Sequence, residues 1–147
     1  MRSTIFLFAW GCNDFRYDLP YRGGNAAGDT AVADPSFAAD IQPILDQHCA
    51  GCHPGQDALD LSTDAYTNLV NQPSQESDLD LVSCTAAGDT ASGAGTGSPD
   101  DSYLVHKLLG DQDAAGGTGG QMPLGVSALT TTEIQTVENW ITKGCTP

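Results

Sequence analysis

The sequence predicts an all-α domain of about three to five short helices joined by long loops. Three observations support this fold class. Apolar residues recur with a helical period after Pro35, and a second helical period lies near the C-terminus. The 17 Gly and 8 Pro among 147 residues then leave much of the remaining chain to turns and loops.

The first 35 residues are predicted to lie outside this domain. Residues 1–12 contain one Arg, a short apolar run and then Gly11-Cys12, which resembles a bacterial lipoprotein signal in which the Cys becomes lipidated. The run is short for such a signal, and Trp10 stands where a smaller residue is usual, so an apolar stub with a stray thiol is the alternative. Residues 13–35 are rich in Gly and show no apolar period, which predicts a flexible linker to a domain at 36–147.

These features predict an exported protein, either periplasmic or an envelope-anchored lipoprotein. The membrane would be contacted only through a lipid anchor on Cys12. No run of 18 apolar residues is present, so an ordinary membrane span is not expected.

The strongly negative charge excludes nucleic acid as a partner and argues against a catalytic role for most of the acidic residues. The formal net charge is −14, and residues 36–147 contain two Lys, no Arg and 15 acidic residues. Nucleic acid is excluded as a partner, because neutralising its phosphates requires clustered Lys and Arg. Most of the many Asp side chains are expected to be solvated surface groups rather than catalytic groups.

The first predicted helix follows Pro35. Its apolar face consists of residues at helical spacing: Phe37, Ile41, Ile44, Leu45 and His48. Ser36 is a candidate N-cap. A start at Ser36 places Pro43 in the second turn, where it would break the helix, whereas a start at Asp40 places it harmlessly in the first turn.

The central motif directly follows this helix and reads Cys49-Ala50-Gly51-Cys52-His53. This C-x-x-C-H pattern is typical of covalent c-type haem attachment. Thiols three residues apart on a helical turn point to the same side, so both can bond the vinyl groups of one haem c, and His53 then faces the iron as a ligand. The alternatives are a redox-active dithiol, half of a zinc site or a disulfide within the motif. No βαβ pattern surrounds the motif, and no second Cys/His pair with zinc spacing follows it.

Met122 is the candidate for the second axial ligand. It is the only Met besides Met1, and it stands between Gly119-Gly120 and Pro123, in a loop that can place a thioether over a haem. His106 is the competitor, although a lone His in a short apolar helix is more often a residue at the solvent edge. His48 adjoins Cys49 and is expected to point away from the iron.

A short helix is predicted over residues 102–109, after Ser98-Pro99, with Leu104, Leu108 and Leu109 as core positions. Cys84 and Cys145 remain as an even pair, and in an oxidising compartment we expect them to form a disulfide. The alternative is two unpaired thiols.

The last predicted helix begins with a capping box, in which Thr130 is the N-cap and Glu133 is residue N3. Its apolar face contains Ile134, Val137, Trp140 and Ile141, and Gly144 ends the helix. We expect this helix to cross the first one and to close the core around the haem.

Together these motifs resemble class I (mitochondrial-type) cytochrome c, and most nearly the small cytochrome c-like domains of planctomycetes and myxobacteria. The resemblance covers about residues 36–145: Phe37 to Leu45, the C-x-x-C-H motif, Ser98 to Leu104, Met122-Pro123 and Leu129 to Gly144. It implies the cytochrome c fold around one covalent haem, attachment through Cys49 and Cys52, and axial ligation by His53 and Met122.

Two features depart from that family. Residues 84–97 look like an inserted mobile loop. The ring of Lys side chains on which mitochondrial cytochrome c docks is missing, so a redox partner with a basic docking surface is expected instead.

The predicted function is that of a one-electron carrier rather than an enzyme. No nucleophile–base pair, phosphate-binding loop or defined carboxylate pair is evident in the sequence. Two alternatives stay open: a haem domain with an open iron site, acting as a peroxidase or ligand sensor, and a tethered electron-transfer accessory domain of a dehydrogenase complex.

Overall fold

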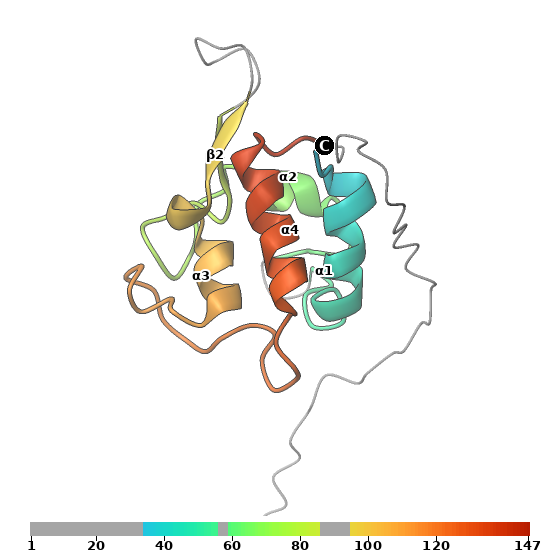
Figure 1. Ribbon diagram of the computed structural model, residues 1–147. Helices are drawn as coiled ribbons and strands as arrows, with labels where there is room; N and C mark the ends of the chain where they lie inside the picture. Colours follow the sequence, from blue (N-terminus) through green and yellow to red (C-terminus); the bar gives the residue numbers. More distant parts are fainter. Residues whose placement is uncertain (1–33, 56–58, 86–94) are drawn as a thin grey trace, which may run out of the picture.

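The computed structural model describes residues 34–55, 59–85 and 95–147. The proposed signal at 1–12, with Cys12, and nearly all of the linker at 13–35 lie outside the described residues. The elements, in chain order, are the π-helical turn η1 (Phe37–Ile41), α1 (Gln42–His48), α2 (Ala65–Leu69), β1 (Ser83–Thr85), β2 (Thr96–Ser98), the 3-10 turn η2 (Pro99–Asp101), α3 (Tyr103–Leu109) and α4 (Thr131–Thr142) (Figure 1). Within the described ranges, no helix is long and apolar enough to cross a bilayer.

The prediction of an all-α fold is wrong, because the chain also forms a small β-sheet. Strands β1 and β2 pair antiparallel, with Cys84 opposite Gly97. These strands lie at the two ends of the segment over residues 84–97, which the sequence predicts to be an inserted loop. Each strand has only three residues, which is too short for an alternating pattern to be recognised.

The sheet is held in place by the last helix. Cys84 of β1 forms a disulfide with Cys145, and the two Cα atoms are 6.2 Å apart. Gly97 of β2 lies so close to Ile141 that a Cβ would overlap the Ile141 carbonyl oxygen. The glycine therefore allows β2 to lie directly against α4, and Figure 1 shows these two elements side by side.

The first helical segment begins at Phe37 after its N-cap Ser36, and it also accommodates Pro43. The Ser36 side chain accepts a hydrogen bond from the Ala39 amide at 3.3 Å, as expected of an N-cap. The Gln42 amide then donates to the Phe37 carbonyl, which makes a single π-helical turn. Pro43 therefore falls at the start of α1, where a missing N–H is tolerated.

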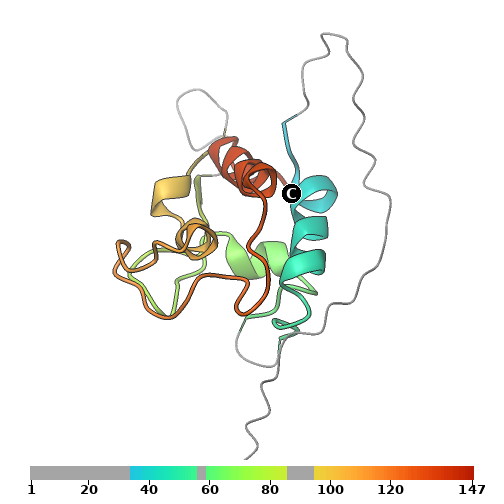
Figure 2. The ribbon, with the colours of Figure 1, turned by 60° about the horizontal axis from the view of Figure 1, so that its bottom comes forward.

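The core lies where the first and last helices meet. Trp140 and Ile141 of α4 and Ile41 of η1 are fully buried. The Phe37 ring packs against the Trp140 ring with centroids 5.4 Å apart, and against the Tyr66 ring at 5.3 Å. Figures 1 and 2 show α1 and α4 as neighbours, with α2 between them on one side.

The capping box of α4 is present as predicted. The Glu133 amide donates to Thr130 Oγ1 at 3.3 Å, and the Thr130 amide donates to Glu133 Oε2 at 2.7 Å. The core prediction for α3 is partly wrong, because Leu108 is buried whereas Leu109 is 48% exposed. Leu104 and Leu108 are four residues apart and share a helix face, and Leu109 lies about 100° away around the helix.

Candidate cofactor site

A cavity of about 440 Å³ lies between the end of α1, α2, the loop over residues 70–82, α3 and Met122. This volume is in the range of about 300–1,000 Å³ that small-molecule and cofactor sites occupy. Its apolar wall consists of leucines: Leu59, Leu61, Leu69, Leu81, Leu104 and Leu108. The cavity can therefore accept a large, mainly apolar group.

The C-x-x-C-H motif forms one hydrogen-bonded turn at the end of α1. The Cys49 carbonyl accepts hydrogen bonds from the Cys52 amide at 3.0 Å and from the His53 amide at 2.9 Å. Cys49 and His53 both line the cavity. The turn thus brings a thiol and an imidazole to the same space.

Cys52 differs from Cys49 and His53 in its surroundings. It is exposed, it is not among the residues that line the cavity, and it is disulfide-bonded in this structure. The Cys52 sulfur is therefore already bonded in this conformation.

The Cys49 thiol is buried, and burial raises its pKa to about 11. Desolvation acts in this direction because it disfavours the charged thiolate. Cys49 is consequently a neutral thiol at pH 7, directed at the cavity rather than at solvent. Such a group reacts slowly with reagents in solution and is available to a partner held inside the cavity.

Met122 reaches the same cavity from a distant part of the chain, 69 residues after His53. Its amide donates to the Lys107 carbonyl of α3 at 2.8 Å, which fixes the backbone at this point. The cavity is thus lined by an imidazole and a thioether from two separate segments.

The two other described histidines have different partners. His106 Nδ1 lies 2.9 Å from Asp111 Oδ1, and its Nε2 lies 3.0 Å from the Asp100 carbonyl. His48 Nε2 lies 3.0 Å from Glu133 Oε1, on the side of α4. Neither histidine is among the residues that line the cavity. In this structure His106 therefore does not compete with Met122 for a place at the cavity.

The residues at the cavity fit a haem c group. A nitrogen ligand and a thioether are the axial pair typical of cytochromes c, and leucines suit the apolar faces of a porphyrin. Cys49 would supply one thioether bond, and Cys52 could supply the second only after its disulfide has been reduced to a thiol. Among the described residues, no three His, Cys, Asp or Glu side chains gather in a way that could hold a bare metal ion.

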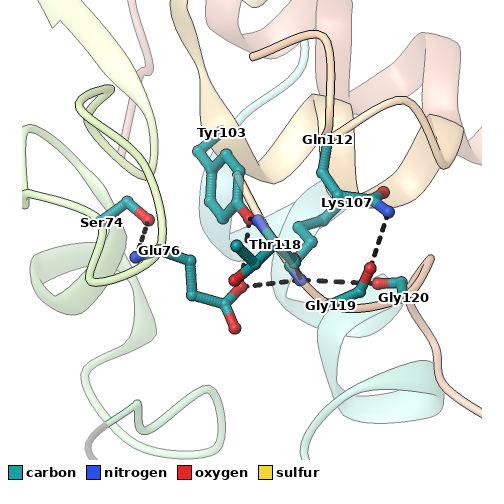
Figure 3. A network of polar contacts seen from close by, with 8 residues as sticks. All are labelled: Ser74, Glu76, Tyr103, Lys107, Gln112, Thr118, Gly119 and Gly120. Carbon is teal, nitrogen blue, oxygen red and sulfur yellow. Dashed lines mark hydrogen bonds and ion pairs between the residues drawn. The ribbon is translucent and has the colours of Figure 1, made fainter. Parts of the chain in front are cut away.

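Sequence reasoning missed a polar group in the wall of this cavity. Glu76, Tyr103 and Lys107 line it and contact one another (Figure 3). The four-residue spacing of Tyr103 and Lys107 on one helix face was a usable signal for half of the group. No local pattern indicates that Glu76, in a loop 31 residues before Lys107, is its ionic partner.

Comparison with protein-family models, with curated proteins and with solved structures found no match for this chain. The functional assignment therefore depends on the residues and geometry described above.

Proposed function

We propose that the chain is a mono-haem c-type cytochrome that acts as a one-electron carrier. The observation on which this proposal rests is the convergence of Cys49, His53 and Met122 on one leucine-lined cavity. The C-x-x-C-H motif is specific for haem attachment. The resemblance of residues 36–145 to class I cytochrome c adds to this observation and leads to the same assignment.

When bound, haem c supplies an iron that gains or loses one electron. His53 and Met122 would hold the iron from the two segments that line the cavity, and no side chain among them would have to make or break a bond with a substrate. The leucine wall would present an apolar surface to the haem, and such a shell helps to set the redox potential of a bound iron. Holding the iron and surrounding it with apolar side chains are the functions of an electron carrier, which needs no catalytic acid or base.

Haem attachment and the disulfide of Cys52 exclude each other, because each consumes the same sulfur. Attachment therefore requires Cys52 to be reduced when the haem is delivered. Cys49 needs no such change, since it is a buried free thiol at the cavity. Haem attachment would therefore follow two-electron reduction of the Cys52 disulfide by an external thiol reductant, which would leave Cys49 and Cys52 as the two thiols that hold the haem.

We further propose export to the periplasm or the envelope, with a redox partner that presents a basic surface. Both Lys residues of the described part are engaged with acids. Lys107 Nζ lies 2.7 Å from Glu76, and Lys143 Nζ lies 2.9 Å from Asp34. The rest of the surface is strongly acidic, so complementary docking requires positive charge on the partner.

The experiment is expression in a host that matures c-type cytochromes, followed by denaturing electrophoresis and a haem stain. We expect the wild-type band to stain, because thioether bonds survive denaturation. Cys49→Ala and Cys52→Ala should each lower the stain, and the double variant should abolish it. Thr131→Ala is the control, since this residue lies outside the motif and its change should alter stability by less than about 0.5 kcal/mol, and it should stain like the wild type. An unstained wild-type band of normal abundance would refute the proposal.

A further inference from the structure

The segment 117–122, which ends in Met122, has no helix or strand of its own within the described residues. It contains Gly117, Gly119 and Gly120, and glycine-rich backbone loses much conformational freedom when it is ordered. An ordered path for this segment therefore requires contacts with other parts of the fold. Those contacts come mainly from one face of α3.

Lys107 holds the segment at both ends. Its carbonyl oxygen accepts from the Met122 amide at 2.8 Å, and its ammonium donates to the Thr118 carbonyl at 2.8 Å. The Gly120 carbonyl lies 3.5 Å from the same ammonium. Only 8% of Lys107 is exposed, so these are shielded, charge-assisted hydrogen bonds.

Tyr103, one helical turn earlier, holds the start of the segment. Its hydroxyl oxygen accepts from the Thr118 amide at 3.3 Å. Its single proton can go to the Thr118 carbonyl at 3.2 Å or to Glu76 Oε2 at 3.1 Å. The ring packs so closely on Gly117 that a Cβ there would overlap it.

Glu76 provides the counter-charge from the opposite wall. Its Oε2 lies 2.7 Å from Lys107 Nζ, and its backbone amide donates to Ser74 Oγ at 3.1 Å (Figure 3). The carboxylate therefore links the loop over residues 70–82 to α3. Without it, Lys107 would keep a charge in a site from which water is mostly excluded.

We propose that Glu76, Tyr103 and Lys107 are positioning residues that hold the Met122 thioether at the cavity, an inference that rests on the proposed function. None of the three belongs to the C-x-x-C-H motif. Their role is to set how often the segment 117–122 opens. This opening frequency determines how readily an external ligand replaces the thioether.

The test compares Lys107→Leu with Lys143→Leu in the full matured chain. Lys143 is the matched control because its ion pair with Asp34 is at least half exposed on both sides. In the oxidised protein, imidazole is titrated while the far-red sulfur-to-iron band is followed. We expect Lys107→Leu to bind imidazole about tenfold or more tightly than wild type, since charge-assisted hydrogen bonds are lost. Lys143→Leu should match wild type, and an unchanged imidazole affinity in Lys107→Leu would overturn the inference.

Amide hydrogen exchange gives a readout that does not depend on the haem. Exchange at Thr118 and Met122 should accelerate about tenfold in Lys107→Leu, while exchange in the α4 core around Val137 stays as in wild type. Equal acceleration in α4 would mean general destabilisation and would overturn the inference. Tyr103→Phe is the milder variant if Lys107→Leu does not fold, and exchange at Thr118 should still rise about threefold.

The two proposals fail in different ways. A matured chain without haem would refute the proposed function, and the exchange comparison would still report whether the three residues hold the segment. A haem-loaded chain in which neither Lys107→Leu nor Tyr103→Phe changes exchange at Thr118 would refute only the positioning role.

Discussion

In the proposed haem site, Met122 is the residue that would distinguish an electron carrier from a haem with an open iron. We expect Met122→Ala to keep its covalent haem, because both thioether positions are intact, but to lose the far-red sulfur-to-iron band and become high-spin in the oxidised state. The absorption spectrum of the oxidised protein measures this. Leu124→Ala is the control, since Leu124 lies in the same loop and is 64% exposed. A wild-type spectrum in Met122→Ala would remove Met122 from the site.

His106 gives a second prediction at the residue scale. Its pKa is raised above the ordinary 6.5, first by the hydrogen bond to the Asp100 carbonyl and then by Asp111. A raised folded-state pKa means that protonated His106 stabilises the fold fully below pH 6.5, and that this stabilisation disappears as the pH rises through the folded pKa. Urea unfolding at several pH values, compared with His106→Asn, should show a wild-type advantage at acidic pH that shrinks towards alkaline pH. A constant difference would contradict the assignment.

The sequence could predict those site residues whose types are rare and whose chemistry is specific, but it could not predict the others. Cys49, His53 and Met122 were predictable because their types are rare in this chain and their chemistry is specific. The ion pair of Glu76 with Lys107 was not, because acidic residues are abundant here and any of them could have been the partner. The disulfide of Cys52 was also not predicted.

At the scale of elements, the cap of α4 is a local feature that the sequence predicts well. Both hydrogen bonds of the capping box connect residues three apart, so no tertiary information is needed. We expect Thr130→Ala to lower the free energy of unfolding by about 1 kcal/mol. Thr131→Ala, one residue on, should change it by less than about 0.5 kcal/mol. Chemical denaturation of the two variants measures the difference, and equal effects would contradict the role of the cap.

The hairpin is the element that the sequence does not reveal, because tertiary contacts define it. Gly97 is required where β2 meets α4, since a Cβ would also lie 2.9 Å from Cys84 Sγ. We expect Gly97→Ala to destabilise the fold by about 1–3 kcal/mol through overpacking. Gly51→Ala is the control, because a Cβ at Gly51 meets nothing within 4 Å. Denaturation midpoints that are the same for both variants would contradict the close approach of β2 to α4.

At the scale of the whole molecule, the acidic surface would, in the proposed carrier, favour redox partners with a positive charge. A small cationic redox complex should react with the haem protein faster at low salt and more slowly as salt is added, since counter-ions screen the attraction. An anionic complex should show the opposite dependence. Stopped-flow rates at several ionic strengths test this, and equal slopes for both reagents would contradict a surface field that selects basic partners.

The proposed function requires that the C-x-x-C-H motif binds one haem through the sulfurs of both Cys49 and Cys52. Mass spectrometry of the proteolytic fragment that contains residues 49–53, taken from the matured chain and treated with reductant, tests it most directly. We expect a fragment that is heavier by one haem and keeps that mass after reduction. A fragment that returns to the mass of the unmodified peptide would contradict it.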